Sequence, residues 1–146
     1  MEIVGRRFTQ GGLVTIDFLE KLTEKINEEL NLPLRLRMGY LQAEDSLVIY
    51  SLPGGRTVEE YFDGTKTKQL NYEIAMKHRS SQTIEETLWE LQSFIDDVVD
   101  VPSEHYQFNG MEITNVPFIN QFDEQNYFIF LLNIQAELTI FEKGEI

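Results

Sequence analysis

The two histidines are the side chains best suited to acid–base or metal chemistry, because an imidazole titrates near neutral pH. They are His78 and His105, 27 positions apart, and neither lies in an acidic motif. A helical metal site would place two such ligands four positions apart. The chain also lacks cysteine, which excludes disulfides, thiolate catalysis and zinc–thiolate sites. We therefore expect His78 at the end of a strand and His105 in a loop, neither of them catalytic.

Adjacent carboxylates are the second group of side chains that could take part in catalysis or metal binding. They include Glu85-Glu86 and Asp96-Asp97, the latter followed by Asp100. General acid–base catalysis needs one carboxyl to be partly desolvated beside another, but these pairs lie in polar runs and are expected to be solvated. The three aspartates also lack the regular oxygen spacing of a calcium loop.

A glycine-rich segment, Pro53-Gly54-Gly55-Arg56, is the third candidate. A phosphate-binding loop must lead into a helix, and no helix pattern follows this segment, so it is predicted to be a turn. The chain contains no nucleophile elbow, phosphate loop or dinucleotide fingerprint. We therefore predict no enzymatic activity, no catalytic residue, no metal and no cofactor.

The distribution of charge says more than the net charge of −13. Residues 1–79 carry 12 acidic and 11 basic side chains, whereas residues 80–146 carry 13 acidic side chains and one base, Lys143. Such a chain is poorly suited to ordinary nucleic-acid binding, which needs Lys and Arg to neutralise phosphates. An acidic surface could meet a basic partner, line a passage for a polyanion, or simply aid solubility.

A length of 146 residues fits one domain, residues 1–146, and no linker or repeat divides it. The first residues lack the apolar core of a signal peptide. No stretch reaches the roughly 20 apolar residues of a membrane helix, so no membrane association is expected.

The first helix is predicted from Asp17 to Asn31, with Asp17 and Glu20 as a capping box and Pro33 as the stop. Its apolar stripe recurs at three- and four-residue steps: Phe18, Leu19, Leu22, Ile26 and Leu30.

The second helix is predicted from Thr83 to Val99, with Thr83 and Glu86 as its capping box. Trp89 and Phe94 widen its apolar stripe and are expected in the core. The stripe itself consists of Ile84, Leu88, Leu91, Ile95 and Val98.

Alternating apolar residues predict the strands. The shorter ones are 34–38, 46–52, 56–62 and 70–77, followed by one or two strands between Tyr106 and Val116. Asp63-Gly64 is predicted to be a tight turn.

The last strand, Tyr127 to Phe141, alternates without a break, with Phe128, Phe130 and the following even-numbered residues on one face. At ~3.3 Å per residue it would span nearly 50 Å, against the ~17–20 Å of an ordinary strand. We therefore expect it either to bend at a bulge or to pair partly with something outside the domain. The order of elements predicts an α+β fold, in which two helices pack on one face of a mostly antiparallel or mixed sheet.

Several segments together resemble a known family. They are Tyr61-Phe62-Asp63-Gly64, the strand Leu70–Lys77, the helical Leu88-Trp89-Glu90-Leu91, the segment Tyr106–Pro117 and the long closing strand. Over residues 55–146 the chain resembles small phage minor capsid proteins that are similar to the tail terminators of long-tailed phages.

The resemblance implies a non-enzymatic protein of the head–tail joining region. Such a protein is made in the host cytoplasm and ends in the virion, where it caps the tail tube as a ring, commonly a hexamer. Its partners would be further copies of itself, the tail-tube protein and the head connector. DNA would pass through the ring without sequence-specific binding.

Two groups of candidate residues follow. Subunit contacts are expected among Leu47, Ile49, Tyr61, Phe62, Phe128 and Phe130. An acidic surface or channel lining is expected from Glu85, Glu86, Asp96, Asp97 and Asp100.

Two other classes of function remain open at this point. One is an acidic, monomeric binding module that engages a basic protein in a salt-sensitive way. The other is a small hydrolase or transferase with a hidden carboxylate site, which would need one acid with a strongly raised pKa.

Overall fold

One strand, β7 (Phe128–Ile140), lies at the centre of the sheet. The computed structural model describes residues 17–121 and 125–141. Within them, six strands are ordered β2-β3-β4-β7-β5, with β6 also paired to β7. The other elements are α1 (Phe18–Glu29), β2 (Arg37–Met38), β3 (Ser46–Glu60), β4 (Lys66–His78), α2 (Ser81–Asp97), β5 (Tyr106–Ile113) and β6 (Ile119–Gln121).

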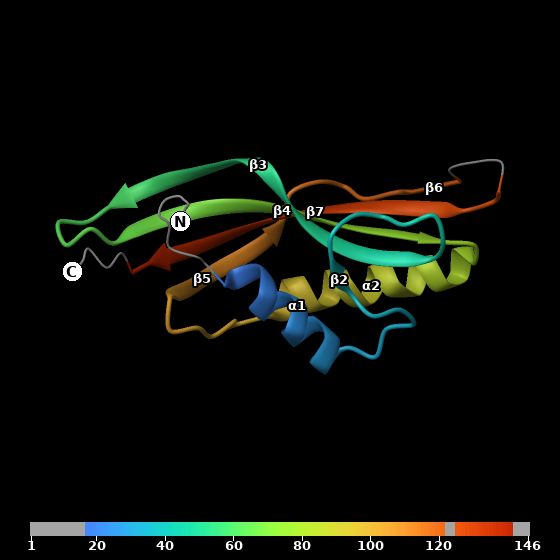
Figure 1. Cartoon of the computed structure of the whole chain (residues 1–146), viewed down its shortest axis with the longest axis horizontal. Coiled ribbons are helices and arrows are strands. Elements are labelled where there is room, and N and C mark those ends of the chain that lie inside the picture. Colours follow the sequence, from blue (N-terminus) through green and yellow to red (C-terminus); the bar gives the residue numbers. More distant parts are fainter. Residues whose placement is uncertain (1–16, 122–124, 142–146) are drawn as a thin grey trace, which may run out of the picture.

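The α+β fold class is confirmed. The β2–β3 pair is parallel and the other strand pairs are antiparallel. Both helices lie on the same side of the sheet (Figure 1). No helix in the described part of the chain is long and apolar enough to cross a membrane.

The alternation of β7 explains why the helices pack on this side. Its even-numbered residues from Phe130 to Ile140 are all buried, whereas Leu131 on the other face is 43% exposed. The buried face meets Phe18, Leu22 and Ile26 of α1. The α2 side chains in the same core are Ile84, Leu88, Leu91, Phe94 and Ile95. Phe18 also lies 5.6 Å, ring to ring, from both Tyr72 and Tyr106.

The expectation that β7 bends or pairs outside the domain is wrong. All of its residues pair with β4, from Phe128 opposite His78 to Ile140 opposite Lys66, without a register shift. Its other edge is covered by β6 at one end and β5 at the other. Between them the Asn115 side chain accepts from the Asn133 N–H (2.8 Å) and donates to the Leu131 carbonyl (3.0 Å). The chain itself therefore provides hydrogen-bonding partners along the whole length of β7.

The predicted turn at Pro53-Gly54-Gly55 is also wrong, because β3 continues through it to Glu60. The register against β4 shifts between Leu52 and Arg56, which marks a β-bulge. Gly54 has φ +101°, a conformation that favours glycine. A bulge tolerates proline because the ladder is interrupted there.

Of the predicted strand 34–38, only Arg37–Met38 forms a strand. The reason is Asn27 of α1, whose amide donates to the Leu36 carbonyl and accepts from the Leu36 N–H, each at 2.9 Å. A side chain thus replaces the ladder partner that a longer strand would need.

Both predicted capping boxes are wrong. Asp17 occupies the N-cap position of α1 without a capping hydrogen bond, and its carboxylate accepts from the Ser103 hydroxyl at 2.8 Å. Helix α2 is capped by Ser80, whose hydroxyl accepts from the Thr83 N–H at 3.2 Å. Serine at this position satisfies one of the free N–H groups of the first turn.

The two faces of β7 predict different costs of truncation. Phe130→Ala should lower the free energy of unfolding by about 3–5 kcal/mol, because it leaves a cavity in the core. Leu131→Ala, on the next residue and the opposite face, should cost less than about 1 kcal/mol. Urea unfolding of both variants measures the difference, and equal costs would contradict this assignment of the faces.

Candidate assembly surfaces

The chain's histidines support its structure. His78 Nδ1 accepts from the Ser80 N–H (3.0 Å), and Nε2 lies 3.4 Å from the Asp45 carboxylate, so the ring links the start of α2 to the loop before β3. His105 is exposed, and its N–H bonds to Ser103. Among the described residues, no three His, Asp or Glu side chains are grouped so that they could hold a metal ion.

Three tyrosines of the described chain are buried or half-buried and have a raised pKa. Burial raises the pKa of Tyr72 and of Tyr106, with nearby carboxylates adding to the effect. The pKa of Tyr50 is raised by burial and by its hydrogen bond to Glu73. A phenol with a raised pKa stays neutral at physiological pH, so Tyr72 and Tyr106 act as packing groups and Tyr50 also donates a hydrogen bond to Glu73.

The structure separates the six proposed contact residues. Leu47, Ile49 and Phe130 are at most 1% exposed and belong to the core, and Phe128 packs against it while partly buried. The three core residues have no surface to offer another subunit, so we do not carry them forward as contact residues. Alternation correctly pairs residues that share a face, but it does not say which face the helices cover.

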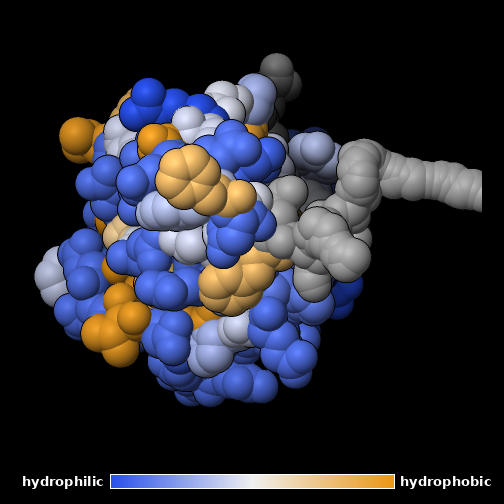
Figure 2. Space-filling view, turned by 90° about the vertical axis from the view of Figure 1, so that its left-hand side faces the viewer, coloured by the Kyte–Doolittle hydropathy of each residue, from blue (hydrophilic) through white to orange (hydrophobic). Residues whose placement is uncertain are grey.

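Tyr61 and Phe62, in contrast, lie at the tip of the hairpin that joins β3 to β4. Tyr61 is 44% exposed and Phe62 is completely exposed. The tip is held by hydrogen bonds from the Tyr61 N–H to the Thr65 carbonyl (2.8 Å) and from the Gly64 N–H to the Tyr61 carbonyl (3.0 Å). Figure 2, which views the molecule from this end, shows hydrophobic side chains standing singly among hydrophilic ones. The hairpin thus presents an aromatic ring on a defined turn.

The five acidic candidates gather on one side of the molecule. Glu85, Glu86, Asp96 and Asp97 are exposed on α2, and Asp100 is exposed just after it. The structure adds Trp89, which is 72% exposed between them, so its expected place in the core is wrong, whereas Phe94 is buried as expected. At 100° per residue, Trp89 falls outside the arc that contains Ile84, Leu91 and Ile95.

A polar sheet face was missed by the sequence analysis. On the side of the sheet away from the helices, Thr67 and Thr139 hydroxyls lie 3.0 Å apart, and Asn109 donates to Thr139 at 2.9 Å. Gln135 donates to Asn71 at 3.0 Å on the same face. The odd-numbered positions of β7 indicate this polar face in the sequence, because they are Asn133, Gln135, Glu137 and Thr139.

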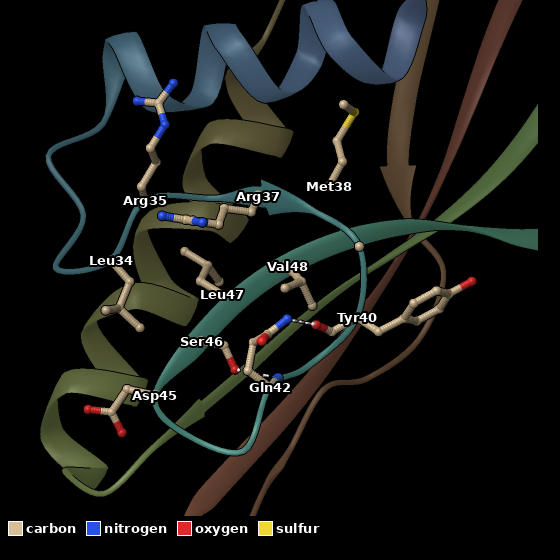
Figure 3. A pocket seen from close by; sticks show the side chains of 11 residues that line it. Leu34, Arg35, Arg37, Met38, Tyr40, Gln42, Asp45, Ser46, Leu47 and Val48 are labelled. Atoms are coloured by element: carbon tan, nitrogen blue, oxygen red, sulfur yellow. Dashed lines mark hydrogen bonds between the residues drawn. The ribbon is translucent and has the colours of Figure 1, made fainter.

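A cavity of about 410 Å³ opens beside β2, at the edge of the sheet (Figure 3). Arg35 and Arg37 line it together with Leu34, Leu47 and Val48. Both arginines are exposed, and within the described residues neither guanidinium has an ion-pair partner. The cavity therefore combines a mixed apolar and polar lining with two arginines and one carboxylate, that of Asp45.

The hairpin tip has a titratable support in Asp63. Its carboxylate accepts from the Thr65 hydroxyl and from the Thr65 N–H (2.9 Å), and these bonds hold the pKa of Asp63 below its ordinary value. Since the folded pKa is depressed, this support is present at neutral pH and is lost only as the pH falls through the folded pKa, below the ordinary range of an aspartate.

We predict that Thr65→Val raises the pKa of Asp63 toward its ordinary value, because the hydroxyl donor is removed while the backbone donor remains. An NMR titration of the Asp63 carboxyl measures this change. Thr57→Val, on exposed β3, is the matched control and should leave the titration unaltered. An unchanged pKa in Thr65→Val would contradict the role of the hydroxyl.

One known protein family matches most of the residues that form this fold. A family model described as bacteriophage tail terminator protein matches residues 21–140, from within α1 to the end of β7. The match reaches further toward the N-terminus than the resemblance over residues 55–146. No curated protein matches the sequence. The chain therefore belongs to the bacteriophage tail terminator family and is a phage structural protein of the tail region.

Proposed function

We propose that this protein closes the phage tail tube as a homo-oligomeric ring, of six copies by analogy with the family, and presents its other side to the head connector. The family match supports a tail protein, and the exposed aromatic hairpin tip carries the step to an assembly. In this proposal the protein is made in the host cytoplasm, acts in the virion and catalyses no reaction.

The hairpin tip is suited to a subunit contact because it exposes apolar surface at a fixed position. Burying a Phe side chain contributes roughly 1.5–3 kcal/mol of free energy. Phe62 is completely exposed in the single chain, so a subunit contact could gain this whole contribution. Tyr61 adds a hydroxyl that donates to Glu59 at 2.9 Å. Aromatic anchors of this kind dominate interface energetics. A closed ring needs a heterologous contact in which one surface meets a different one on the next copy.

The surfaces that DNA could meet are poor in free cations. On the outer face of β4, β7 and β5, Lys77 is the only basic side chain among the described residues. Its ammonium is held near the carbonyls of Gln42 (3.4 Å) and Ala43 (3.2 Å). Because these three strands carry few free cations, they retain phosphates weakly, which suits a passage for DNA.

An acidic binding module remains the second candidate, because exposed Trp89 lies among carboxylates on α2. It predicts a strict monomer that binds a basic protein more weakly as salt rises. A ring-sized species therefore favours the ring, whereas a monomer leaves binding to the tail tube to separate the two functions.

We predict that Tyr61→Ala/Phe62→Ala weakens self-association while the fold stays intact, because the hairpin tip is stabilised by backbone bonds rather than by these rings. Light scattering after size exclusion, over a range of protein concentration and salt, measures the change. Phe118→Ala is the matched control, since Phe118 is 67% exposed beside β6, at the other end of the sheet (Figure 1). Unchanged assembly of the double variant would remove the hairpin from the interface.

A further inference from the structure

Trp89 is the largest exposed side chain on α2, with two glutamates one turn before it and uncharged Gln92 and Ser93 one turn after it. Glu85 and Glu86 lie one turn before it and Asp96 lies two turns after it, all exposed. Tryptophan is enriched among the residues that dominate binding energy. A tryptophan with carboxylates nearby fits a partner surface that is apolar at its centre and cationic at its rim.

The orientation of Trp89 follows from its neighbours. Glu86 and Glu90 line a cavity with Asn31 and Leu32, which follow α1, so that side of α2 faces the first helix. Trp89 does not line this cavity or the one between Lys25 and Asp97. The ring, which is 72% exposed, therefore lies on the solvent side of α2.

The cavity beside β2 has the complementary properties. Its lining offers half-buried Leu34 and exposed Met38 as apolar surface, and Arg35 and Arg37 outnumber the one carboxylate, that of Asp45. Figure 3 shows these arginines along the segment that precedes β3, with Leu47 beneath them. Its volume of about 410 Å³ lies within the ~300–1,000 Å³ of binding pockets. A guanidinium over an indole face is a favourable cation–π arrangement.

The two surfaces occupy different parts of the molecule. The cavity lies at the β2 edge of the sheet, whereas α2 packs beneath β4, β5 and β7 (Figure 1). Two different, complementary surfaces on one chain are what a head-to-tail contact between copies requires.

We propose that Trp89 of one copy docks into the Arg35/Arg37 cavity of the next, with Glu85 and Asp96 paired to the arginines. This contact rests on the proposed ring and specifies one of its subunit interfaces. It also gives the uneven charge of the chain a role, since the bases of the first half meet the acids of the second.

The test uses two variants of the full chain, each of which removes one half of the contact. Trp89→Ala removes the inserted ring, and Arg35→Glu/Arg37→Glu reverses the charge of the cavity. Analytical ultracentrifugation should show that each variant self-associates at least about tenfold more weakly than the wild type. The equimolar mixture should form dimers and stop there, because each variant keeps the half that the other lacks. Lys21→Glu/Arg56→Glu, on exposed bases outside the cavity, is the matched control and should assemble normally.

Three outcomes would overturn the proposal. They are normal assembly of either variant, a mixture that stays as weak as its components, and a wild-type chain that is monomeric at every concentration. None of them decides the proposed function, because binding of the wild type to the end of isolated tail tubes is a separate readout. Tube capping with normally assembling variants would retain the ring and reject this contact alone.

Discussion

The pairing of β7 with β4 is the constraint on which the rest of the structure depends. All residues from Phe128 to Ile140 are in register, and every second one faces the helices. A slip of one residue would turn Asn133, Gln135, Glu137 and Thr139 into the core and the apolar set into water. Because that exchange is so unfavourable, the register of the longest strands is strongly specified. The positions of the hairpin tip and of both helices follow from it.

Much of this arrangement could be predicted from periodicity, which identified both helices, β4 and the length of β7. What periodicity missed are interactions between residues distant in sequence. Asn27 takes the place of a strand partner for Leu36, and Asn115 fills the gap between β5 and β6. The bulge at Pro53-Gly54-Gly55 depends on β4 continuing opposite it. The contact candidates show the same limit, since only packing reveals that Phe130 faces the core and Phe62 faces water.

One covered sheet face leaves three distinct surfaces for assembly. The hairpin tip exposes aromatic rings, α2 exposes Trp89 among carboxylates, and the β2 edge exposes two arginines around a cavity. These surfaces differ in chemistry and lie on different elements, and a heterologous assembly joins two different surfaces. The fourth surface, the hydrogen-bonded amide and hydroxyl face of the sheet, carries the bases Lys77 and Arg56, each of which donates hydrogen bonds within the chain.

Electron microscopy of isolated tail tubes incubated with the purified chain tests the central claim most directly. If the protein caps the tail tube, the images will show ring-shaped density at one end of each tube, coaxial with its channel and absent from the other end. Tubes whose two ends remain identical and bare at saturating protein concentration would contradict a terminator role for this chain.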